Sequence, residues 1–177
     1  MTSPQARDAF NVAKEPREVR EKYGLNRFGQ CCLLARRLIE AGVRVMTFDW
    51  GGWDTHSNNF VTLKQQLPKL DIAMSALLQD LADRGMDKDV SIVMWGEFGR
   101  TPRVNKDAGR DHYPNVFSAA LAGGRIKGGR VLGSSDANGA FPKDNAKPPH
   151  DVLATIYQHL GIDTKKAYRT PSGRPVP

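Results

Sequence analysis

The 177-residue chain is poor in cysteine and lacks several features that mark common protein classes. Its two cysteines, Cys31 and Cys32, are adjacent, so they form neither a disulfide framework nor a Cys-x-x-Cys metal site. No apolar run is long enough to span a bilayer, and no signal-peptide pattern opens the sequence. The composition therefore favours an ordinary globular domain without a membrane partner.

Motifs of several enzyme classes are missing as well. There is no G-x-S-x-G nucleophile elbow and no Gly-rich phosphate loop, which argues against acyl transfer by a triad and against dinucleotide binding. The net charge is +7, but the basic residues are scattered and lack interleaved aromatics, so we expect no nucleic-acid partner. The positive charge instead favours a small anion or an acidic glycan.

Apolar residues at helical spacing predict three substantial helices, over residues 26–41, 60–84 and 149–160. A glycine follows each of them, at Gly42, Gly85 and Gly161, as expected for a helix end. Residues 1–23 predict one or two short polar helices divided at Pro16.

Apolar, β-branched runs predict strands over residues 43–49, 89–95, 116–122 and 130–132. Helix and strand alternate as in a βαβ unit, which predicts an α/β fold with parallel pairing. We assign this fold to residues 1–163 and a polar, Pro-rich tail to residues 164–177.

Polar side chains follow the first predicted strand. Gly51 and Gly52 end the strand, and Asp54 and His56 come next in a loop. Ligand sites in open α/β sheets lie beyond the carboxyl ends of parallel strands, which is where this loop is expected. A carboxylate with an imidazole suits Zn²⁺ or a similar divalent metal. Such a pair is common in ordinary polar loops, and its position after the strand and the Gly-Gly turn is what strengthens the ligand interpretation.

The second predicted strand leads into a turn that carries Glu97 and Arg100. Glu97 is a candidate metal ligand or acid/base group, and Arg100 either pairs with it structurally or holds an anionic group. Asp111 and His112 follow, and either one is a ligand that the other orients. We expect the ligands to converge at the ends of adjacent parallel strands, with donor atoms from Asp54, His56, Glu97 and His112.

Four blocks of the sequence resemble the signature motifs of the domain of unknown function 1501 family, namely residues 36–44, 51–60, 96–102 and 109–114. The blocks occur in the same order, and the likeness extends to residues 173–175. This family consists of mostly exported bacterial proteins, often labelled sulfatases, within the alkaline phosphatase superfamily. The resemblance implies a three-layer α/β/α sandwich with a mostly parallel sheet, binding zinc or calcium and hydrolysing sulfate or phosphate esters.

The resemblance also implies roles for individual residues. It assigns metal ligation to Asp54, His56, Asp111 and His112, catalysis to Glu97 and Arg100, and substrate binding to Arg100 and Arg110. The chain departs from the superfamily pattern at Phe98, which stands where a ligand histidine is expected, so Asp111 and His112 form an alternative ligand pair. We expect Phe98 and Trp53 either to form an apolar wall beside the metal or simply to fill the core.

The superfamily's nucleophile and first metal-binding aspartate come from an N-terminal half, so the resemblance implies that this chain is a C-terminal portion. A missing N-terminal half is then an expected partner, together with an anionic small-molecule or glycan ester, and the chain alone is expected to be inactive. Its location is not predicted. The alternative is a non-catalytic α/β module that binds an anionic glycan or a protein partner through the basic residues Arg125, Lys127 and Arg130.

Overall fold

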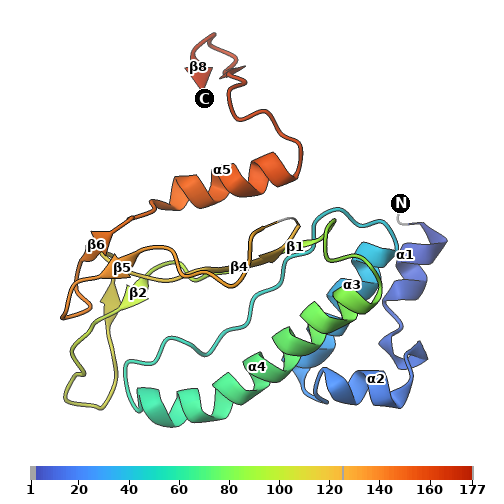
Figure 1. The fold of residues 1–177 in the computed structure, drawn as a ribbon, viewed down its shortest axis with the longest axis horizontal. Helices are drawn as coiled ribbons and strands as arrows, with labels where there is room; N and C mark the ends of the chain where they lie inside the picture. Colours follow the sequence, from blue (N-terminus) through green and yellow to red (C-terminus); the bar gives the residue numbers. More distant parts are fainter. Residues whose placement is uncertain (1–2, 125, 177) are drawn as a thin grey trace.

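The computed structural model describes residues 3–124 and 126–176. Its N-terminal end is helical (Figure 1) and contains α1 (Pro4–Ala9), the 3-10 helix η1 (Val12–Lys14), α2 (Arg17–Lys22) and α3 (Arg27–Glu40). Asn26 caps α3, because its side chain accepts a hydrogen bond from the backbone N–H of Gly29 at 3.1 Å. The short N-terminal helices separated near Pro16 and the helix predicted over 26–41 are confirmed.

Helix α4 (Asn59–Asp83) packs against α3 and forms the main core with it. The buried side chains of this core are Tyr23, Phe28, Cys32, Leu33, Ala73, Leu77 and Leu81. Pro68 lies inside α4, and Gly85 follows its end with a φ of 67°. Burying each large apolar side chain contributes about 1.5–3 kcal/mol, so the α3–α4 contact anchors the fold. None of the helices within residues 3–124 and 126–176 is long and apolar enough to cross a membrane.

A charged residue lies inside this helical end. Arg36 on α3 is only 2% exposed. Its Nη1 donates to Glu40 at 2.7 Å, while Nη2 and Nε form ion pairs with Glu15 and Asp80, both at 3.0 Å. The hydroxyl of Tyr23 donates to Asp80 at 2.8 Å. A buried guanidinium requires such pairing, so these contacts connect η1, α3 and α4.

The strands of the described residues form four separate two-stranded sheets, all antiparallel. The pairs are β1 (Ser91–Met94) with β4 (Ala120–Gly123), β2 (Gly99–Arg100) with β3 (His112–Tyr113), β5 (Ser134–Ser135) with β6 (Pro142–Asp144), and β7 (Tyr168–Arg169) with β8 (Pro175–Val176). The predicted three-layer α/β/α sandwich with a mostly parallel sheet is therefore wrong, since no parallel pair occurs in the part of the chain that the structure describes.

The error lies in the strand predicted over residues 43–49. This segment has no strand assignment and pairs with no strand in the described residues. Phe48 of this segment and the adjoining Trp50 pack on α3 instead, with the ring of Phe48 5.8 Å from that of Phe28 and the ring of Trp50 stacked on Phe28 at 4.0 Å. The next predicted strand forms as β1. Because residues 43–49 do not reach it, β1 pairs antiparallel with the later strand β4.

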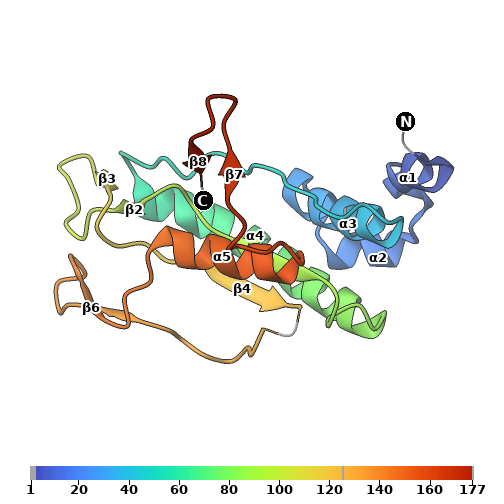
Figure 2. The same ribbon diagram turned by 90° about the horizontal axis from the view of Figure 1, so that it is seen from above.

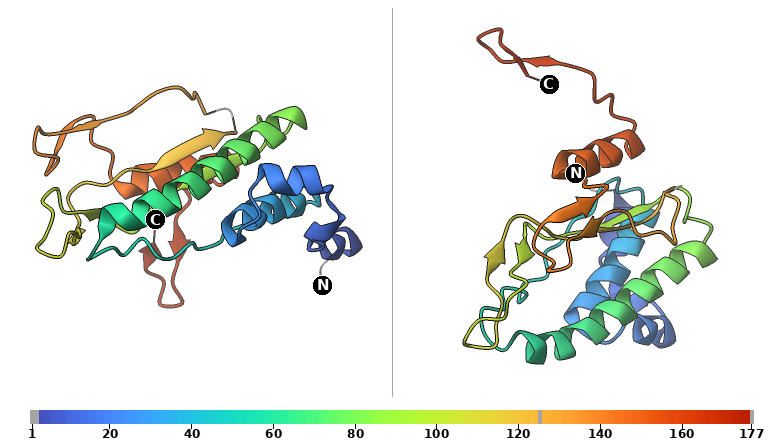
Figure 3. Two further views of the ribbon diagram at one scale, coloured as in Figure 1. Left: turned by 90° about the horizontal axis from the view of Figure 1, so that it is seen from below. Right: turned by 60° about the vertical axis from the view of Figure 1, so that its left-hand side comes forward.

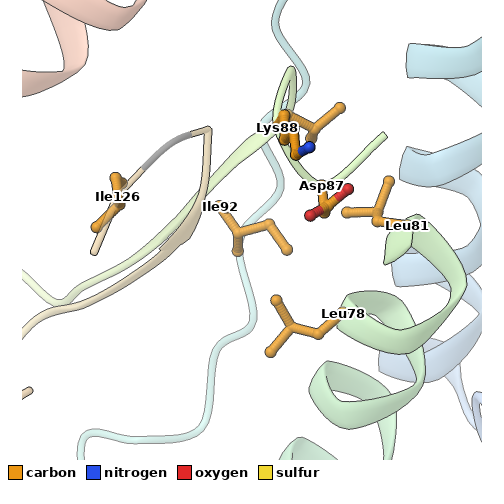
Figure 4. A pocket seen from close by; sticks show the side chains of 8 residues that line it. Leu78, Leu81, Asp87, Lys88, Ile92 and Ile126 are labelled. Carbon is orange, nitrogen blue, oxygen red and sulfur yellow. The ribbon is translucent and has the colours of Figure 1, made fainter. Parts of the chain in front are cut away.

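Helix α5 (Pro149–His159) confirms the last predicted helix and lies across the β1–β4 sheet from α4 (Figures 1 and 3). Two cavities of about 260 and 370 Å³ lie between α4 and this sheet. Leu78, Leu81 and Ile92 line the smaller one, with Asp87 and Lys88 at its edge (Figure 4). The strand predicted over 130–132 is not formed, and the β7–β8 hairpin lies in the exposed segment after residue 164.

Candidate metal centre

Two loops far apart in the sequence meet at the end of the molecule opposite the N-terminal helices (Figure 2). The backbone N–H of Arg110 donates to the carbonyl of Thr55 at 3.0 Å, which joins the loop before α4 to the loop between β2 and β3. Gly109 permits this contact, because a Cβ atom at this position would lie 1.9 Å from the carbonyl oxygen of His56. The pairing of the loops thus depends on a residue without a side chain.

The short β2–β3 ladder then fixes two further side chains. Its register places Arg100 directly opposite His112, so both side chains leave the same face of the ladder. The backbone N–H of Thr101 donates to the carbonyl of Asp111 at 2.9 Å and extends the pairing by one residue. The ladder therefore holds Arg100 and His112 beside the loop that carries Asp54 and His56.

Three donor atoms converge where the loops meet. Asp54 Oδ1 lies 2.9 Å from His56 Nε2 and 2.8 Å from His112 Nε2, and the two imidazole nitrogens are 3.2 Å apart. A tetrahedral zinc ion with bonds of 2.0–2.1 Å needs ligand atoms about 3.3 Å apart. Shifts of a few tenths of an ångström would open this triangle to a metal, so the residues fit a divalent ion.

The other ring nitrogen of His56 is held by a carboxylate. His56 Nδ1 lies 2.7 Å from Asp111 Oδ1, which favours the tautomer with the proton on Nδ1 and a lone pair on Nε2. That lone pair faces Asp54 Oδ1 and His112 Nε2, and lone pairs this close repel each other unless a proton or a cation lies between them. Of the two roles left open for Asp111, this geometry favours that of the orienting residue.

Hydrogen bonds keep both carboxylates ionised. Bonds from His112 and Arg100, the first making the larger contribution, lower the pKa of Asp54 to about 2. The pKa of Asp111 is also lowered, chiefly by its hydrogen bond with His56 and further by one from Asn105. Because metal ligands must be deprotonated, Asp54 is ready to bind a cation at neutral pH.

The centre is open on one side and has an aromatic ring on another. The side chains of Asp54, His56 and His112 are 63%, 47% and 49% exposed, which leaves room for water or a substrate. The ring of Phe98 packs against His112, with centroids 4.2 Å apart, as expected for a wall residue. Trp53 instead packs edge-on against Trp50 at 4.9 Å, within the aromatic cluster on α3.

Not every predicted site residue joins the cluster. Glu97 is exposed and forms no hydrogen bond or ion pair with another residue in the described ranges. Arg100 pairs with Asp54 rather than with Glu97, its Nη2 lying 2.7 Å from Oδ1. Arg110 donates to the carbonyl of Thr101 at 3.0 Å. Three of the four predicted ligands thus converge, although not at the ends of parallel strands.

Arg110 also lies over the ring of Phe60, with 5.7 Å between its guanidinium carbon and the ring centroid, so it is held within the loop.

The residue that sequence analysis missed is Asn105, whose side-chain amide lies 3.2 Å from Asp111 Oδ1. The available signal was an asparagine in a predicted loop, a residue type that favours a side-chain turn without indicating a role.

Comparison with known proteins identifies a family. The family model described as a protein of unknown function (DUF1501) matches residues 1–177. No curated protein and no solved structure matches the chain. The chain therefore belongs to the domain of unknown function 1501 family, as its four sequence blocks predicted.

Proposed function

We propose that Asp54, His56 and His112 bind one divalent metal ion that serves the hydrolysis of a sulfate or phosphate ester. The observation that carries the proposal is the convergence of three electron-pair donors from two loops, within 4.8 Å of one another. Three protein ligands with a fourth position open to solvent are the pattern of catalytic zinc sites, whereas structural zinc sites are closed. The half-exposed ligands support the catalytic pattern.

Zinc or a similar transition metal fits this donor set better than calcium. Two imidazole nitrogens and one carboxylate oxygen suit zinc, while calcium takes six to eight oxygen ligands. The carboxylate of Asp111 on the far nitrogen of His56 adds the carboxylate–histidine pair that commonly accompanies zinc. We therefore propose zinc as the ion, with Asp111 outside the coordination sphere.

Arg100 supports an anionic substrate. Its guanidinium is 21% exposed and reaches Asp54 from β2, so it borders the open side of the triangle. A divalent ion held here supplies Lewis acidity and lowers the pKa of a bound water molecule. Arg100 would hold an ester oxyanion beside it, since a planar guanidinium binds sulfate and phosphate in a bidentate manner. An anionic small-molecule or glycan ester is accordingly the proposed substrate.

The proposed place in the alkaline phosphatase superfamily rests on the resemblance of the sequence blocks alone, because the observed sheets differ from that fold. Two-metal ester hydrolysis places its ions about 3.5–4 Å apart and needs a second set of ligands. Within the described residues one such ligand group is found. We therefore propose that these residues bind metal but turn over simple esters slowly unless further residues, such as an additional N-terminal half, complete the site.

Calorimetric zinc titration, run alongside hydrolysis assays with p-nitrophenyl sulfate and phosphate, tests this function. We expect one zinc per chain for the wild type and for His150→Ala, an exposed histidine away from the cluster. The double variant His56→Ala with His112→Ala should bind none. Equal zinc binding by the double variant would contradict the site, and robust turnover that disappears in it would contradict the expectation of slow turnover.

The non-catalytic alternative has its own test. Lys127 and Arg130 of the basic segment are exposed, while Arg125 lies outside the described residues. If the chain binds a sulfated glycan through this segment, Lys127→Gln with Arg130→Gln should abolish binding and Arg100→Gln should not. The proposed metal centre predicts the opposite result for a small sulfate ester in the presence of zinc.

A further inference from the structure

We infer that Asn105 is a positioning residue that holds the Asp111 carboxylate against Nδ1 of His56 and so keeps Nε2 directed at the metal. The inference rests on the metal centre proposed above. Asn105 Nδ2 lies 3.2 and 3.3 Å from the two carboxylate oxygens of Asp111 and 2.9 Å from the carbonyl oxygen of His56. One amide group thus contacts both members of the His56–Asp111 pair.

The orientation of the Asn105 amide follows from its surroundings. Its Oδ1 accepts hydrogen bonds from the backbone N–H groups of Asp107 at 3.0 Å and Gly109 at 2.9 Å. A flipped amide would place its NH₂ group against these two donors and lose both bonds. The loop therefore dictates that the NH₂ group faces Asp111.

The Asp111 carboxylate needs such a restraint. Its side chain is 52% exposed, so water competes with His56 for both of its oxygens. Without the amide, the carboxylate is free to rotate away from Nδ1, and the proton on His56 can move between the two ring nitrogens. Loss of a residue of this kind costs about 10–100-fold in metal affinity, because the ligand histidine is then no longer oriented.

Asn105 also helps to build the loop, since its side-chain Oδ1 accepts hydrogen bonds from the backbone N–H groups of Asp107 and Gly109. A double-mutant cycle separates the two roles. Cobalt(II) affinity is measured for the wild type, Asn105→Ala, Asp111→Ala and the double variant, with the cobalt d–d absorption spectrum reporting coordination geometry. If Asn105 acts through Asp111, removing it from the Asp111→Ala background should lower the affinity no further.

The expected result is a loss of about 10–100-fold for each single variant and the same loss for the double variant. The spectra of the two single variants should change in the same way. If the losses multiply, Asn105 only supports the loop and the inference is overturned. If Asn105→Ala fails to fold, Asn105→Asp replaces it, because it keeps an oxygen for the Asp107 and Gly109 N–H groups while removing the NH₂ donor.

The added negative charge of Asn105→Asp by itself favours cation binding. Weaker cobalt binding by this variant would therefore indicate that Asp111 has lost its position, through the missing NH₂ donor and the repulsion between the two carboxylates. Unchanged or tighter binding by Asn105→Asp overturns the inference. Failure of the wild type to bind cobalt or zinc would overturn the proposed metal centre and this inference together. Binding by the wild type with multiplying losses in the cycle would overturn the inference alone.

Discussion

The helical end and the loop end of the molecule both gather charged side chains, but they use them in opposite ways (Figure 2). At the helical end Arg36 is buried and all of its partners are carboxylates that neutralise it. At the loop end Asp54, His56 and His112 are half-exposed, and their donor atoms point at one another. In the first arrangement the charges neutralise one another within the fold, whereas in the second they remain accessible to a ligand.

The charge balance of the two clusters shows the same difference. At the helical end four basic side chains face four carboxylates, the members being Arg36, Arg37, Arg84, Lys14, Glu15, Glu40, Asp80 and Asp8. At the loop end the carboxylates of Asp54 and Asp111 face Arg100 and two imidazoles. We therefore expect changes in the helical cluster to affect stability and changes in the loop cluster to affect binding.

The largest effect on stability is expected from Arg36→Met. This change leaves three carboxylates in partly buried positions without their central partner and should lower the free energy of unfolding by about 3–5 kcal/mol. Urea unfolding measures the loss. The control is Arg17→Met, which removes an 82% exposed arginine paired with Glu21 and should cost less than about 1 kcal/mol. A loss for Arg36→Met as small as that of the control would refute the comparison.

Gly109→Ala should have the next largest effect, because its Cβ atom would clash with the backbone of His56. We expect a loss of about 1–3 kcal/mol, as for other overpacked positions, together with loss of zinc binding as the two loops separate. Gly128→Ala is the matched control, since nothing lies within 4 Å of a Cβ atom there. Retained zinc affinity in Gly109→Ala would show that the close approach of the loops is not needed.

A change of pH should have a smaller effect on the free energy of unfolding, because only the carboxylates of the helical cluster titrate in the accessible range. Burial alone raises the pKa of Glu15 and Asp80, but hydrogen bonds from arginines lower both below their ordinary values of 4.5 and 3.8. Since the folded pKa values are depressed, this stabilisation is complete above about pH 4.5 and is lost as the pH falls through the folded values. Urea unfolding between pH 2 and 6 should show this slope in the wild type and a flatter one in Arg36→Met.

The smallest effect on stability is expected from His56→Ala. The side chain is 47% exposed and makes no core contact, so metal-free stability should remain within about 0.5 kcal/mol of the wild type. Zinc affinity should nevertheless fall below detection, because one of three ligands is removed. Thermal unfolding with and without zinc measures both quantities, since zinc should raise the melting temperature of the wild type only. Strong destabilisation of metal-free His56→Ala would indicate that the cluster is structural.

Several features of both ends of the molecule were predictable from the sequence. The apolar spacing of residues 26–41 and 60–84 predicted α3 and α4, because helical periodicity is local. Asp54, His56 and His112 were predicted as ligands because their side-chain types suit a metal and they follow glycine-rich turns. The pairing of strands was not predictable, since the partner of β1 depends on whether residues 43–49 reach the sheet or pack on α3.

Two roles at the loop end were beyond sequence reasoning for a related reason. Nothing in the residue types distinguishes Glu97, which forms no hydrogen bond or ion pair in the described residues, from Asp111, which lies within hydrogen-bond distance of His56. The role of Asn105 depends on its contacts with Asp111 in its own loop and with the carbonyl of His56 in the other loop, and an asparagine in a loop is equally suited to an ordinary turn. Such roles emerge only when the loops are placed side by side.

A crystal structure of the zinc-loaded chain, with anomalous data at the zinc edge, is the decisive test of the proposed metal centre. A single anomalous peak is expected about 2.0–2.2 Å from a carboxylate oxygen of Asp54 and the Nε2 atoms of His56 and His112. Asp111 should remain on Nδ1 of His56, outside the coordination sphere. A peak coordinated by other residues, or no peak between these three side chains at saturating zinc, would contradict the proposed metal centre.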